Sequence, residues 1–588
     1  MKKQLLMLGL AVGSVFSTKA QSADIQWAKG FGATGTGIDN AASIAIDDAG
    51  NVYTAGLFTG TTDLDPGPGT FSVSASGAER EIYIQKLNAN GDFAWGATFQ
   101  NTQSKYPSKI TVDPSGNVIL VGRFRGTMDF DPGPGTANRT AVGLSGIPGS
   151  NDDAFIVKLD TDGNYMWATS MGQFNTDLAS YVTTDAAGNI YTTGIYRNNV
   201  DFNPGSGTNV LTNNGGANIF IQKLSPNGDY IWARGYGGTS TDHGKAVVVD
   251  ANQNVYLAAT ISSDNWAFDS NNLANSSHSV QGNGSDVVVL KLNQAGNFLW
   301  SSQVGGNSSE DVWGIALDNL EKPVITGTFS GSGDFNPGSG TFTLSTSGST
   351  DAYTLKLNTS GDFEWATKIG GTSDDVGRGI ATDAAGNSYT TGYFRVAADF
   401  DPGAGTDNRT SAGNREIFVQ KLDTDGNYVW AKTIGGTGDD YGIALDHNAA
   451  GALVIAGFFS GTVDFEDGSG VTNLTSNGGR DAYVVKYFEC APETATDVIT
   501  ACGSYQWING TTYTSDNNSA QVTLTNQAGC DSVVTLDLTI SQPEATTDVI
   551  TACGSYEWIN GTTYTSDNNL AQVTLTNQAG CDSVVTLD

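Results

Sequence analysis

The side chains with the greatest chemical potential in this sequence are its 61 carboxylates, and many of them recur in two fixed settings. The first setting is a proline-glycine loop that reads TDLDPGPGT, MDFDPGPGT, VDFNPGSGT, GDFNPGSGT and ADFDPGAGT. Paired carboxylates such as Asp129 and Asp131 could join backbone carbonyls in binding Ca²⁺, which takes about six to eight oxygens. Pro and Gly also make this loop a tight reversal without any metal. Because Asn203 and Asn336 replace the second Asp in two copies, we favour a loop-shaping role and keep Ca²⁺ as the alternative.

The second setting is a segment such as GGTSDDVG, in which an acid follows a Gly-Gly pair. A catalytic acid is normally unique in its site, whereas these acids repeat, so no catalytic residue and no cofactor are assigned. The three histidines do not lie beside a Ser or Cys in a recognisable motif, which favours loop or surface roles for His243, His278 and His447. The second acid of the segment aligns as Asp39, Asp177, Asp242, Asp311, Asp375 and Asp440, with Lys105 in the second copy.

These residues belong to a repeat of 65 to 72 residues. Each copy contains four short β-rich runs joined by turns such as AAGN and TDG, and no window shows a helical period. Four strands in each of seven copies predict an all-β, seven-bladed β-propeller over residues 21–489, with a Trp of each outer strand packed between blades. The copies are marked by Trp27, Trp95, Trp167, Trp232, Trp300, Trp365 and Trp430.

The phase of the repeat predicts how the ring closes. The chain begins with a Trp strand that has no hairpin partner and the last copy lacks such a strand, so residues 24–30 should pair with residues 482–488. One face of the propeller should carry tight turns, and the other should carry the long loops with both sets of acids. We expect ligand binding on this long-loop face. Its acidity favours a cationic partner, or a neutral glycan held through Ca²⁺.

The units GNxYxTGxF, DFDPGPGT and GGTxxD resemble the SBBP-type bacterial seven-bladed β-propeller repeat of exported proteins, over about residues 24–489. The resemblance implies the fold and an exported protein, and it says little about activity.

Past residue 490 the composition changes, and TDVITACGSYQWINGTTYTSDNN recurs almost unchanged. Residues 490–541 and 542–588 are expected to form two small β-sandwich-like modules, the second one truncated. They resemble tandem Cys-containing modules of Bacteroidetes proteins that leave by the type IX route. In an oxidising compartment we expect one disulfide within each module, Cys502 to Cys530 and Cys553 to Cys581, which leaves Cys490 over.

The first 20 residues combine two lysines, an apolar run from Leu5 to Phe16 and a small-residue cleavage motif, as in a signal peptide. No other run is long and apolar enough to span a membrane. The net charge of −33 makes nucleic acid a poor partner. We therefore expect a monomeric propeller, secreted or on the cell surface of a Gram-negative bacterium, that binds an extracellular glycan or protein without catalysis. A secreted polysaccharide hydrolase or lyase is the alternative.

Overall fold

The computed structural model describes residues 23–33, 35–76, 80–101, 103–142, 151–263, 266–268, 277–282, 284–467, 470–489, 494–525, 531–576 and 581–588. These residues form β-strands and turns without any helix, so none of them forms a helix that could cross a membrane. The chain divides into two compact units, Ser22–Glu489 and a second unit that contains Cys490–Asp588. The expected signal peptide, residues 1–20, and Cys490 lie outside the described residues.

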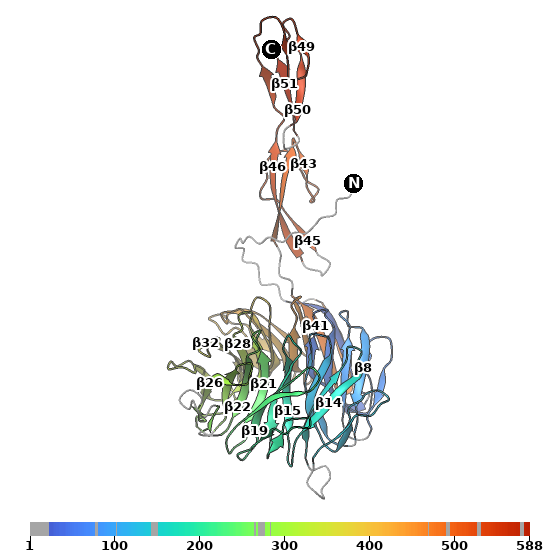
Figure 1. Cartoon of the computed structure of the whole chain (residues 1–588), viewed down its shortest axis with the longest axis vertical. Coiled ribbons are helices and arrows are strands. Elements are labelled where there is room, and N and C mark those ends of the chain that lie inside the picture. The colour runs from blue at the N-terminus through green and yellow to red at the C-terminus, as the bar shows by residue number, and fades with distance from the viewer. Residues whose placement is uncertain are drawn as a thin grey trace. The chain divides into compact units, whose positions relative to one another are not determined.

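The larger unit is a β-propeller built from antiparallel sheets that stand side by side (Figure 1). In each sheet one strand, here called the inner strand, lines the central channel of the propeller. It is the first strand of its sheet in chain order, except in the last sheet, where the N-terminal strand Asp24–Phe31 comes first and Tyr441–His447 is the inner strand. Apolar side chains of neighbouring sheets share a core, as Ile84 and Val157 do. Two strands of each sheet are buried on both faces because other sheets cover them. Their sequences are consequently apolar almost throughout, as in β4 (Val52–Phe58).

The sheets repeat one strand order. From the inner strand outward they are β3 (Asn40–Ile46), β4, β7 (Glu81–Leu87) and β8 (Phe93–Phe99); β9 (Lys105–Val112), β10 (Val118–Phe124), β13 (Asp153–Leu159) and β14 (Tyr165–Met171); β15 (Leu178–Thr184), β16 (Ile190–Tyr196), β19 (Asn218–Leu224) and β20 (Tyr230–Tyr236); β21 (His243–Val249), β22 (Val255–Ile261), β25 (Asp286–Leu292) and β26 (Phe298–Gly306); β27 (Glu310–Leu317), β28 (Pro323–Phe329), β31 (Asp351–Leu357) and β32 (Phe363–Gly371); and β33 (Val376–Thr382), β34 (Ser388–Phe394), β37 (Glu416–Leu422) and β38 (Tyr428–Ile434).

The last sheet joins the two ends of the unit. It contains β39 (Tyr441–His447), β40 (Ala452–Asp464), β41 (Asn473–Phe488) and the N-terminal β1 (Asp24–Phe31). β1 pairs antiparallel with β41, from Asp24 opposite Phe488 to Phe31 opposite Ala482. This is the pairing that the phase of the repeat predicts, and it covers an edge of β41 that would otherwise be open.

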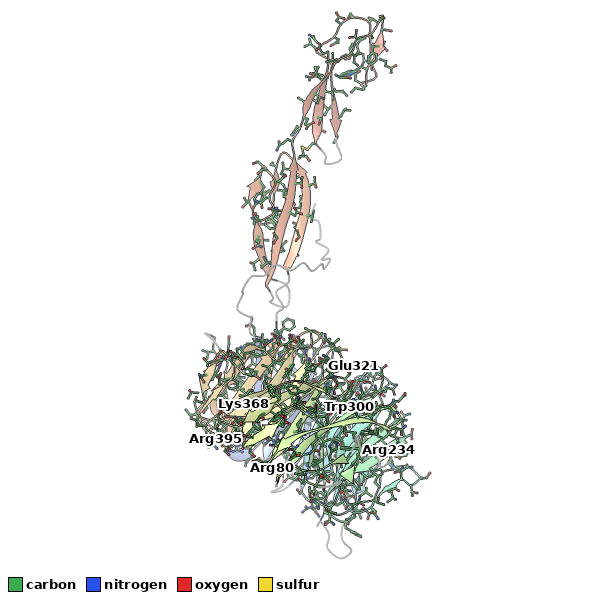
Figure 2. All side chains as sticks on the ribbon, turned by 90° about the vertical axis from the view of Figure 1, so that its left-hand side faces the viewer. Arg80, Arg234, Trp300, Glu321, Lys368 and Arg395 are labelled. Atoms are coloured by element: carbon green, nitrogen blue, oxygen red, sulfur yellow. A yellow bond between two sulfur atoms is a disulfide. The ribbon has the colours of Figure 1, made fainter. Side chains whose placement is uncertain are left out.

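The tryptophans of the outer strands link neighbouring sheets, as expected. The indole of Trp300 (Figure 2) donates a hydrogen bond from Nε1 to the Thr359 carbonyl oxygen at 3.0 Å, in a turn of the next sheet. Trp365 donates in the same way to Thr424 at 3.0 Å. Gly426 of that turn packs against the Trp365 ring and has a φ of 81°, so a side chain there would clash with the indole. The TDG turns are therefore contact points between sheets.

The smaller unit contains two similar β modules. In the first, β42 (Thr494–Cys502) runs parallel to β46 (Asp531–Ser541), β45 (Gln521–Thr525) pairs antiparallel with β46, and β43 (Tyr505–Gln506) pairs with β44 (Thr512–Tyr513). The second repeats this order with β47 (Ala545–Asp548), β51 (Asp582–Leu587), β50 (Gln572–Thr576), β48 (Tyr556–Glu557) and β49 (Thr563–Tyr564). A buried Trp in each module donates its indole N–H to an Asp at 2.8 Å, Trp507 to Asp497 and Trp558 to Asp548.

The disulfide prediction was wrong. Cys502 is bonded to Cys581, with a Cα–Cα distance of 5.1 Å, and Cys553 is free and exposed. Because β47 and β51 are parallel, Cys553 follows the end of one strand while Cys581 precedes the start of the other. At about 3.3 Å per residue the length of β51 separates them beyond disulfide reach. The thiol of Cys502, at the end of β42, instead meets Cys581, the second cysteine of the second module. This bond also excludes Cys502 to Cys530, and Cys530 itself lies outside the described residues.

Peptide mapping can test this linkage. Under non-reducing conditions, digestion of the mature protein should release a peptide pair joined through Cys502 and Cys581, while Cys553 should react with an alkylating reagent before reduction. Cys502→Ser should make Cys581 reactive, whereas Cys553→Ser should leave the joined peptides unchanged. A peptide pair joined through Cys553 and Cys581 would contradict the parallel-strand arrangement.

Candidate functional site

All but one of the acids aligned in the sequence occupy one position at the start of an inner strand, here called the ring position. They are at most 2% exposed, so they do not form a charged binding surface, contrary to expectation. Each aspartate at this position accepts backbone N–H groups from two loops. Asp375, for example, accepts from Gly371 at 2.7 Å and from Arg395 at 3.0 Å. The ring position is occupied by Asp39, Lys105, Asp177, Asp242, Glu310, Asp375 and Asp440.

One residue of that alignment was wrong by one position. Glu310, rather than Asp311, is buried at the ring position and accepts the Gly306 N–H at 3.0 Å. The carboxylate of Asp311 is 28% exposed and forms an ion pair with Lys245 at 3.0 Å. The longer Glu side chain reaches the equivalent N–H, which leaves Asp311 to pair with Lys245.

A second acid faces the ring position from the third strand of the preceding sheet, here called the third-strand position. One of its oxygens accepts a loop N–H, as Asp153 Oδ2 does from Val142 at 2.9 Å. Its other oxygen is buried without a hydrogen-bond partner in Asp153, Asp351 and Asp481. Burial, with the neighbouring charge, raises the pKa of Asp177 to about 8. The facing pairs are Asp39 with Asp481, Lys105 with Glu81, Asp177 with Asp153, Asp242 with Asn218, Glu310 with Asp286, Asp375 with Asp351 and Asp440 with Glu416.

The acids of the proline-glycine loops are used to fold those loops. Asp129 Oδ1 accepts the N–H groups of Asp131 at 3.0 Å and of Ala137 at 2.7 Å, and Asp131 Oδ1 accepts that of Gly133 at 2.8 Å. Asn203 makes the same bond to Gly205 at 2.9 Å, so this turn needs no charge. The Phe between the two Asp residues, such as Phe130, is fully buried in the sheet core. In the part of the chain that the structure describes, no three His, Cys, Asp or Glu side chains are grouped to hold a metal ion.

The loops are further held by short hairpins. These are β5 (Thr61–Asp63) with β6 (Ser72–Ser74), β11 (Thr127–Asp129) with β12 (Asn138–Thr140), β17 (Val200–Asp201) with β18 (Val210–Leu211), β23 (Trp266–Ala267) with β24 (Ser277–His278), β29 (Ser332–Asp334) with β30 (Thr343–Ser345), and β35 (Ala397–Asp399) with β36 (Asn408–Thr410). In addition, β2 (Gly35–Ile38) pairs parallel with β41. β26 and β32 extend to pair with β29 and β35, so these hairpins also tie one sheet to the next.

The central channel contains the candidate ligand site. A cavity of ≈ 310 Å³ is lined by the first halves of the inner strands, and a second one by their later halves. Inner strands start at the long-loop face, so the first cavity, here called the mouth cavity, lies toward that face. Its lining residues include Lys109, Lys245 and Arg378 but no Asp or Glu. In a chain with 61 acidic and 28 basic residues, this is a local reversal of charge.

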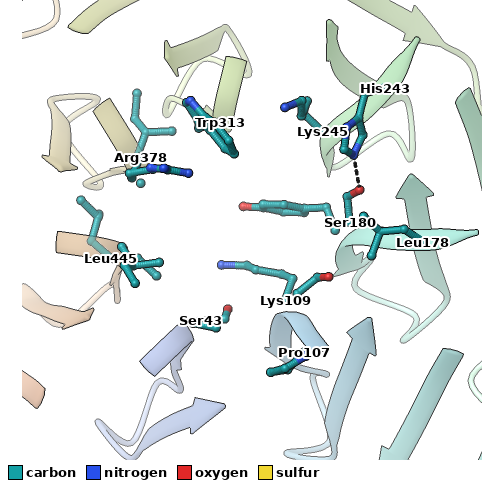
Figure 3. Close-up of a pocket in the computed structure, with 18 residues that line it drawn as sticks. Ser43, Pro107, Lys109, Leu178, Ser180, His243, Lys245, Trp313, Arg378 and Leu445 are labelled. Atoms are coloured by element: carbon teal, nitrogen blue, oxygen red, sulfur yellow. Dashed lines mark hydrogen bonds between the residues drawn. The ribbon is translucent and has the colours of Figure 1, made fainter. Parts of the chain in front are cut away.

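The cations of the mouth cavity surround an aromatic side chain (Figure 3). Trp313 lies between Arg378 and Lys245, whose charged groups are 3.9 Å and 4.2 Å from its ring centroid. Burial lowers the pKa of Arg378, although a guanidinium remains charged near neutral pH. The Trp313 Nε1 donor is buried without a hydrogen-bond partner among the described residues. The stack therefore presents positive charge to the channel.

Lys109 brings a further cation from the opposite side of the cavity (Figure 3). Its ammonium group is 5.0 Å from the ring centroid of Tyr181 and points into the channel. Among the described residues, neither Lys109 nor Arg378 forms an ion pair, whereas Lys158 and Lys356 each bind a turn Asp at 2.8 Å. Asp446 and Asp311 interact electrostatically with Lys109 and Arg378, respectively, without forming an ion pair with them. The charges of Lys109 and Arg378 are thus available to bind an anionic group of a ligand.

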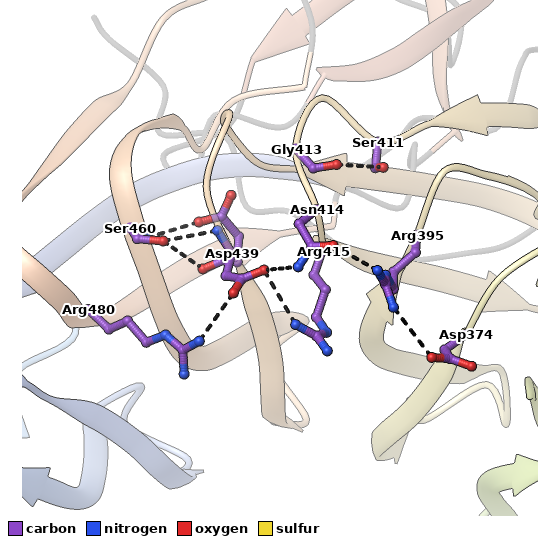
Figure 4. Close-up of polar contacts among 10 residues, drawn as sticks. Asp374, Arg395, Ser411, Gly413, Asn414, Arg415, Asp439, Ser460 and Arg480 are labelled. Atoms are coloured by element: carbon purple, nitrogen blue, oxygen red, sulfur yellow. Dashed lines mark hydrogen bonds and ion pairs between the residues drawn. The ribbon is translucent and has the colours of Figure 1, made fainter.

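Three arginines extend this charge to the rim of the long-loop face (Figure 4). Arg415 and Arg480 share Asp439 at 3.4 Å and 3.1 Å, and Arg395 forms an ion pair with Asp374 at 3.4 Å. Against the effect of burial, the Asn414 hydrogen bond and both guanidinium groups hold the pKa of Asp439 below its ordinary value. Three arginines with two aspartates leave this rim with an excess of positive charge.

His243 is the histidine that lines the mouth cavity. Its Nε2 is 2.8 Å from Ser180 Oγ, a contact that sequence reasoning missed. Burial, together with the charge of Lys245, lowers its pKa to about 3, so the ring is neutral and a weak base. His278 instead contacts Gln303 and Ser301 at 2.9 Å and 2.8 Å, and His447 stacks on Tyr389 with ring centroids 5.1 Å apart. Neither of these two lines the mouth cavity.

One feature of the sequence could have identified the mouth cavity. Three residues after the ring position the repeat does not conserve a residue type, although the side chains there face the channel. The residues at this position are Ala42, Ser108, Ser180, Lys245, Trp313, Arg378 and Ile443. Residues that recur in every repeat build the scaffold, whereas residues that differ between repeats at a channel-lining position form an asymmetric site.

Comparisons with known proteins support the fold. Residues 364–393 match the beta-propeller repeat family. An uncharacterized WD repeat-containing protein of Acanthamoeba polyphaga mimivirus is 26% identical over 542 residues, 79% of this chain and 38% of that protein. The regulatory protein FlaEY of Caulobacter vibrioides is 24% identical over 24% of this chain and 14% of its own length. The chain thus spans well under two thirds of these relatives.

Among solved structures, a protein of unknown function from Dyadobacter fermentans covers 66% of this chain and is itself covered to 95%, at 10% identity and a TM-score of 0.32. The Neurospora crassa Pan2 WD40 domain covers 78% of this chain, is covered to 95% and is 8% identical, with a TM-score of 0.35. An ulvan-specific polysaccharide lyase covers 78% of this chain, is covered to 96% and is 10% identical, with a TM-score of 0.34.

Proposed function

We propose that this protein is an exported, non-enzymatic binding protein that recognises a glycan at the mouth cavity, on the long-loop face of its propeller. The observation that carries the proposal is the mouth cavity, where residues that differ between repeats converge on the channel of a rigid, repetitive scaffold. Propellers commonly serve as binding scaffolds, so a recognition role agrees with the fold.

The lining of the mouth cavity favours binding over hydrolysis. Hydrolysis of a glycosidic bond generally uses two carboxyl groups about 5 to 10 Å apart. No described carboxyl side chain lines this cavity, and the acids at the ring position are buried in hydrogen bonds to backbone N–H groups. The weak basicity of His243 also disfavours proton abstraction of the kind that a lyase needs.

Export is supported by the N-terminal sequence, whose two lysines, apolar run and small-residue motif are typical of a secreted or cell-surface protein. The disulfide between Cys502 and Cys581 suits an oxidising environment. In this proposal the two β modules form a spacer, and the propeller carries the recognition.

A glycan array probed with the mature chain, residues 21–588, tests the proposal. We expect selective binding that Ser108→Trp abolishes, because Ser108 lines the mouth cavity and the large ring would fill it. The matched control is Ala385→Trp, which adds the same ring to an exposed turn at the opposite end of an inner strand and should bind normally. A repeat in EDTA tests the alternative in which Ca²⁺ takes part in binding. Absence of any bound glycan, or equal binding by Ser108→Trp, would contradict the proposal.

A further inference from the structure

We infer that the mouth cavity selects an acidic sugar and binds its carboxylate or sulfate group between Arg378 and Lys109. This inference rests on the proposed function and names the class of glycan. It departs from the expectation of a cationic or neutral partner, because that expectation relied on acids that the structure buries at the ring position and in loop turns.

The charges of the mouth cavity are not balanced within the protein. Lys245 is neutralised by Asp311 at 3.0 Å, whereas Arg378 and Lys109 form no ion pair among the described residues. A buried or half-buried cation without a partner is costly, and an anionic ligand would remove that cost. The mouth cavity therefore favours a ligand with a negative charge, although the protein as a whole repels one.

The guanidinium group of Arg378 is oriented to bind an oxyanion. Arg378 stacks on Trp313, which fixes the guanidinium plane at 3.9 Å from the ring centroid and points its donors into the channel (Figure 3). Planar guanidinium groups bind carboxylates and sulfates through paired N–H donors. An oxyanion held by Arg378 could be reached by the ammonium group of Lys109 from the other side of the cavity.

Other residues of the mouth cavity can bind the uncharged part of the sugar. The hydroxyl groups of Ser43, Ser108 and Ser180 line the same cavity, where they can bind sugar hydroxyls. A volume of ≈ 310 Å³ is at the lower end of ligand-binding pockets and suits one or two sugar rings, such as the end of a glycan chain. The excess positive charge of Arg395, Arg415 and Arg480 at the rim would attract further acidic residues of that chain.

Calorimetric titration of the mature chain tests the inference. The probes are oligogalacturonate, its fully methyl-esterified form, a sulfated galactan oligosaccharide and an acidic peptide. We expect the free acid or the sulfated probe to bind, with an affinity that falls as salt is added, and the methyl ester to bind at least about tenfold more weakly. Binding of the free acid alone identifies a carboxylate as the anion, and binding of the sulfated probe alone identifies a sulfate.

Arg378→Gln and Lys109→Gln should each weaken binding of the acidic sugar by about tenfold or more. Arg234→Gln is the matched control, since Arg234 lies on an outer strand and bonds carbonyl oxygens of the next sheet (Figure 2). Equally tight binding of the acid and its methyl ester, or unchanged binding by both variants, overturns the inference but leaves glycan recognition intact. Equally tight binding of the acidic peptide also overturns it. Failure to bind any sugar, on the array as well, overturns the proposed function itself.

Discussion

Lys105→Met should lower the free energy of unfolding of the propeller by about 3 to 5 kcal/mol. The Lys105 ammonium is 2.8 Å from Glu81 Oε2, and both side chains are fully buried. It also donates to the carbonyl oxygens of Asn101 at 2.9 Å and of Gln103 at 3.0 Å. Methionine retains most of the volume but leaves the Glu81 carboxylate buried without a counter-charge. Denaturant-induced unfolding, followed by tryptophan fluorescence, measures the loss.

A second substitution separates the charge from the packing. Glu81→Gln in the Lys105→Met background removes the isolated carboxylate, so the double variant should be more stable than Lys105→Met alone. Lys86→Met is the matched control. Lys86 lies on β7, the strand of Glu81, and is only partly buried, so this substitution should lower the free energy of unfolding by less than about 1 kcal/mol. Equal losses in Lys105→Met and Lys86→Met would contradict a dominant role for the buried ion pair.

The repeat explains why most of the fold could be predicted from the sequence. Most copies have a Gly-containing turn such as TDG at the same place, so several copies support the same assignment of strands and turns. The phase of the copies also predicts the pairing of β1 with β41. The Trp contacts follow for the same reason, since every outer strand offers an indole to the next turn. Burial of the acids could not be read in this way, because a carboxylate that accepts N–H groups and one that faces solvent look alike in sequence.

The failures have physical causes. Glu310 has one methylene more than an Asp and therefore reaches the Gly306 N–H, so the residue at the ring position is Glu310 and not the aligned Asp311. The disulfide prediction assumed that cysteines of one module lie close together, and a parallel strand pair separates them. The mouth cavity was missed because Arg378 and Lys109 come from strands that are far apart in the chain, and only the closed ring brings them to one channel.

Raising the pH from about 6.5 to 8.5 should lower the Tm of the propeller, as the facing acid pairs lose their shared protons. Burial first, then the neighbouring charge, raises the pKa of Glu310 to about 8 and of Asp375 to about 7. The unfolded chain has lost these protons above about pH 5. The folded state therefore holds protons that the unfolded state lacks, and stability falls by about 1.4 kcal/mol per pH unit for each such proton until the folded pKa is passed.

The histidines do not obscure this window. His243 has its pKa lowered to about 3, so its contribution to stability is lost only as the pH falls below the unfolded value of about 6.5. Above that pH the ring is neutral in both states.

Two natural variations of the pair indicate which substitution removes the effect. One sheet interface has Lys105 facing Glu81, and another has Asp242 facing Asn218, so neither interface holds two carboxylates. Asp153→Asn copies the second arrangement and can still accept the Val142 N–H through its amide oxygen. Without the facing charge the pKa of Asp177 should fall, one proton fewer should be held, and the variant should be more stable than the native protein at pH 8.5. Asp162→Asn, in an exposed turn, should leave the slope of Tm against pH unchanged. If Asp153→Asn shows the native slope, the facing carboxylates do not share a proton.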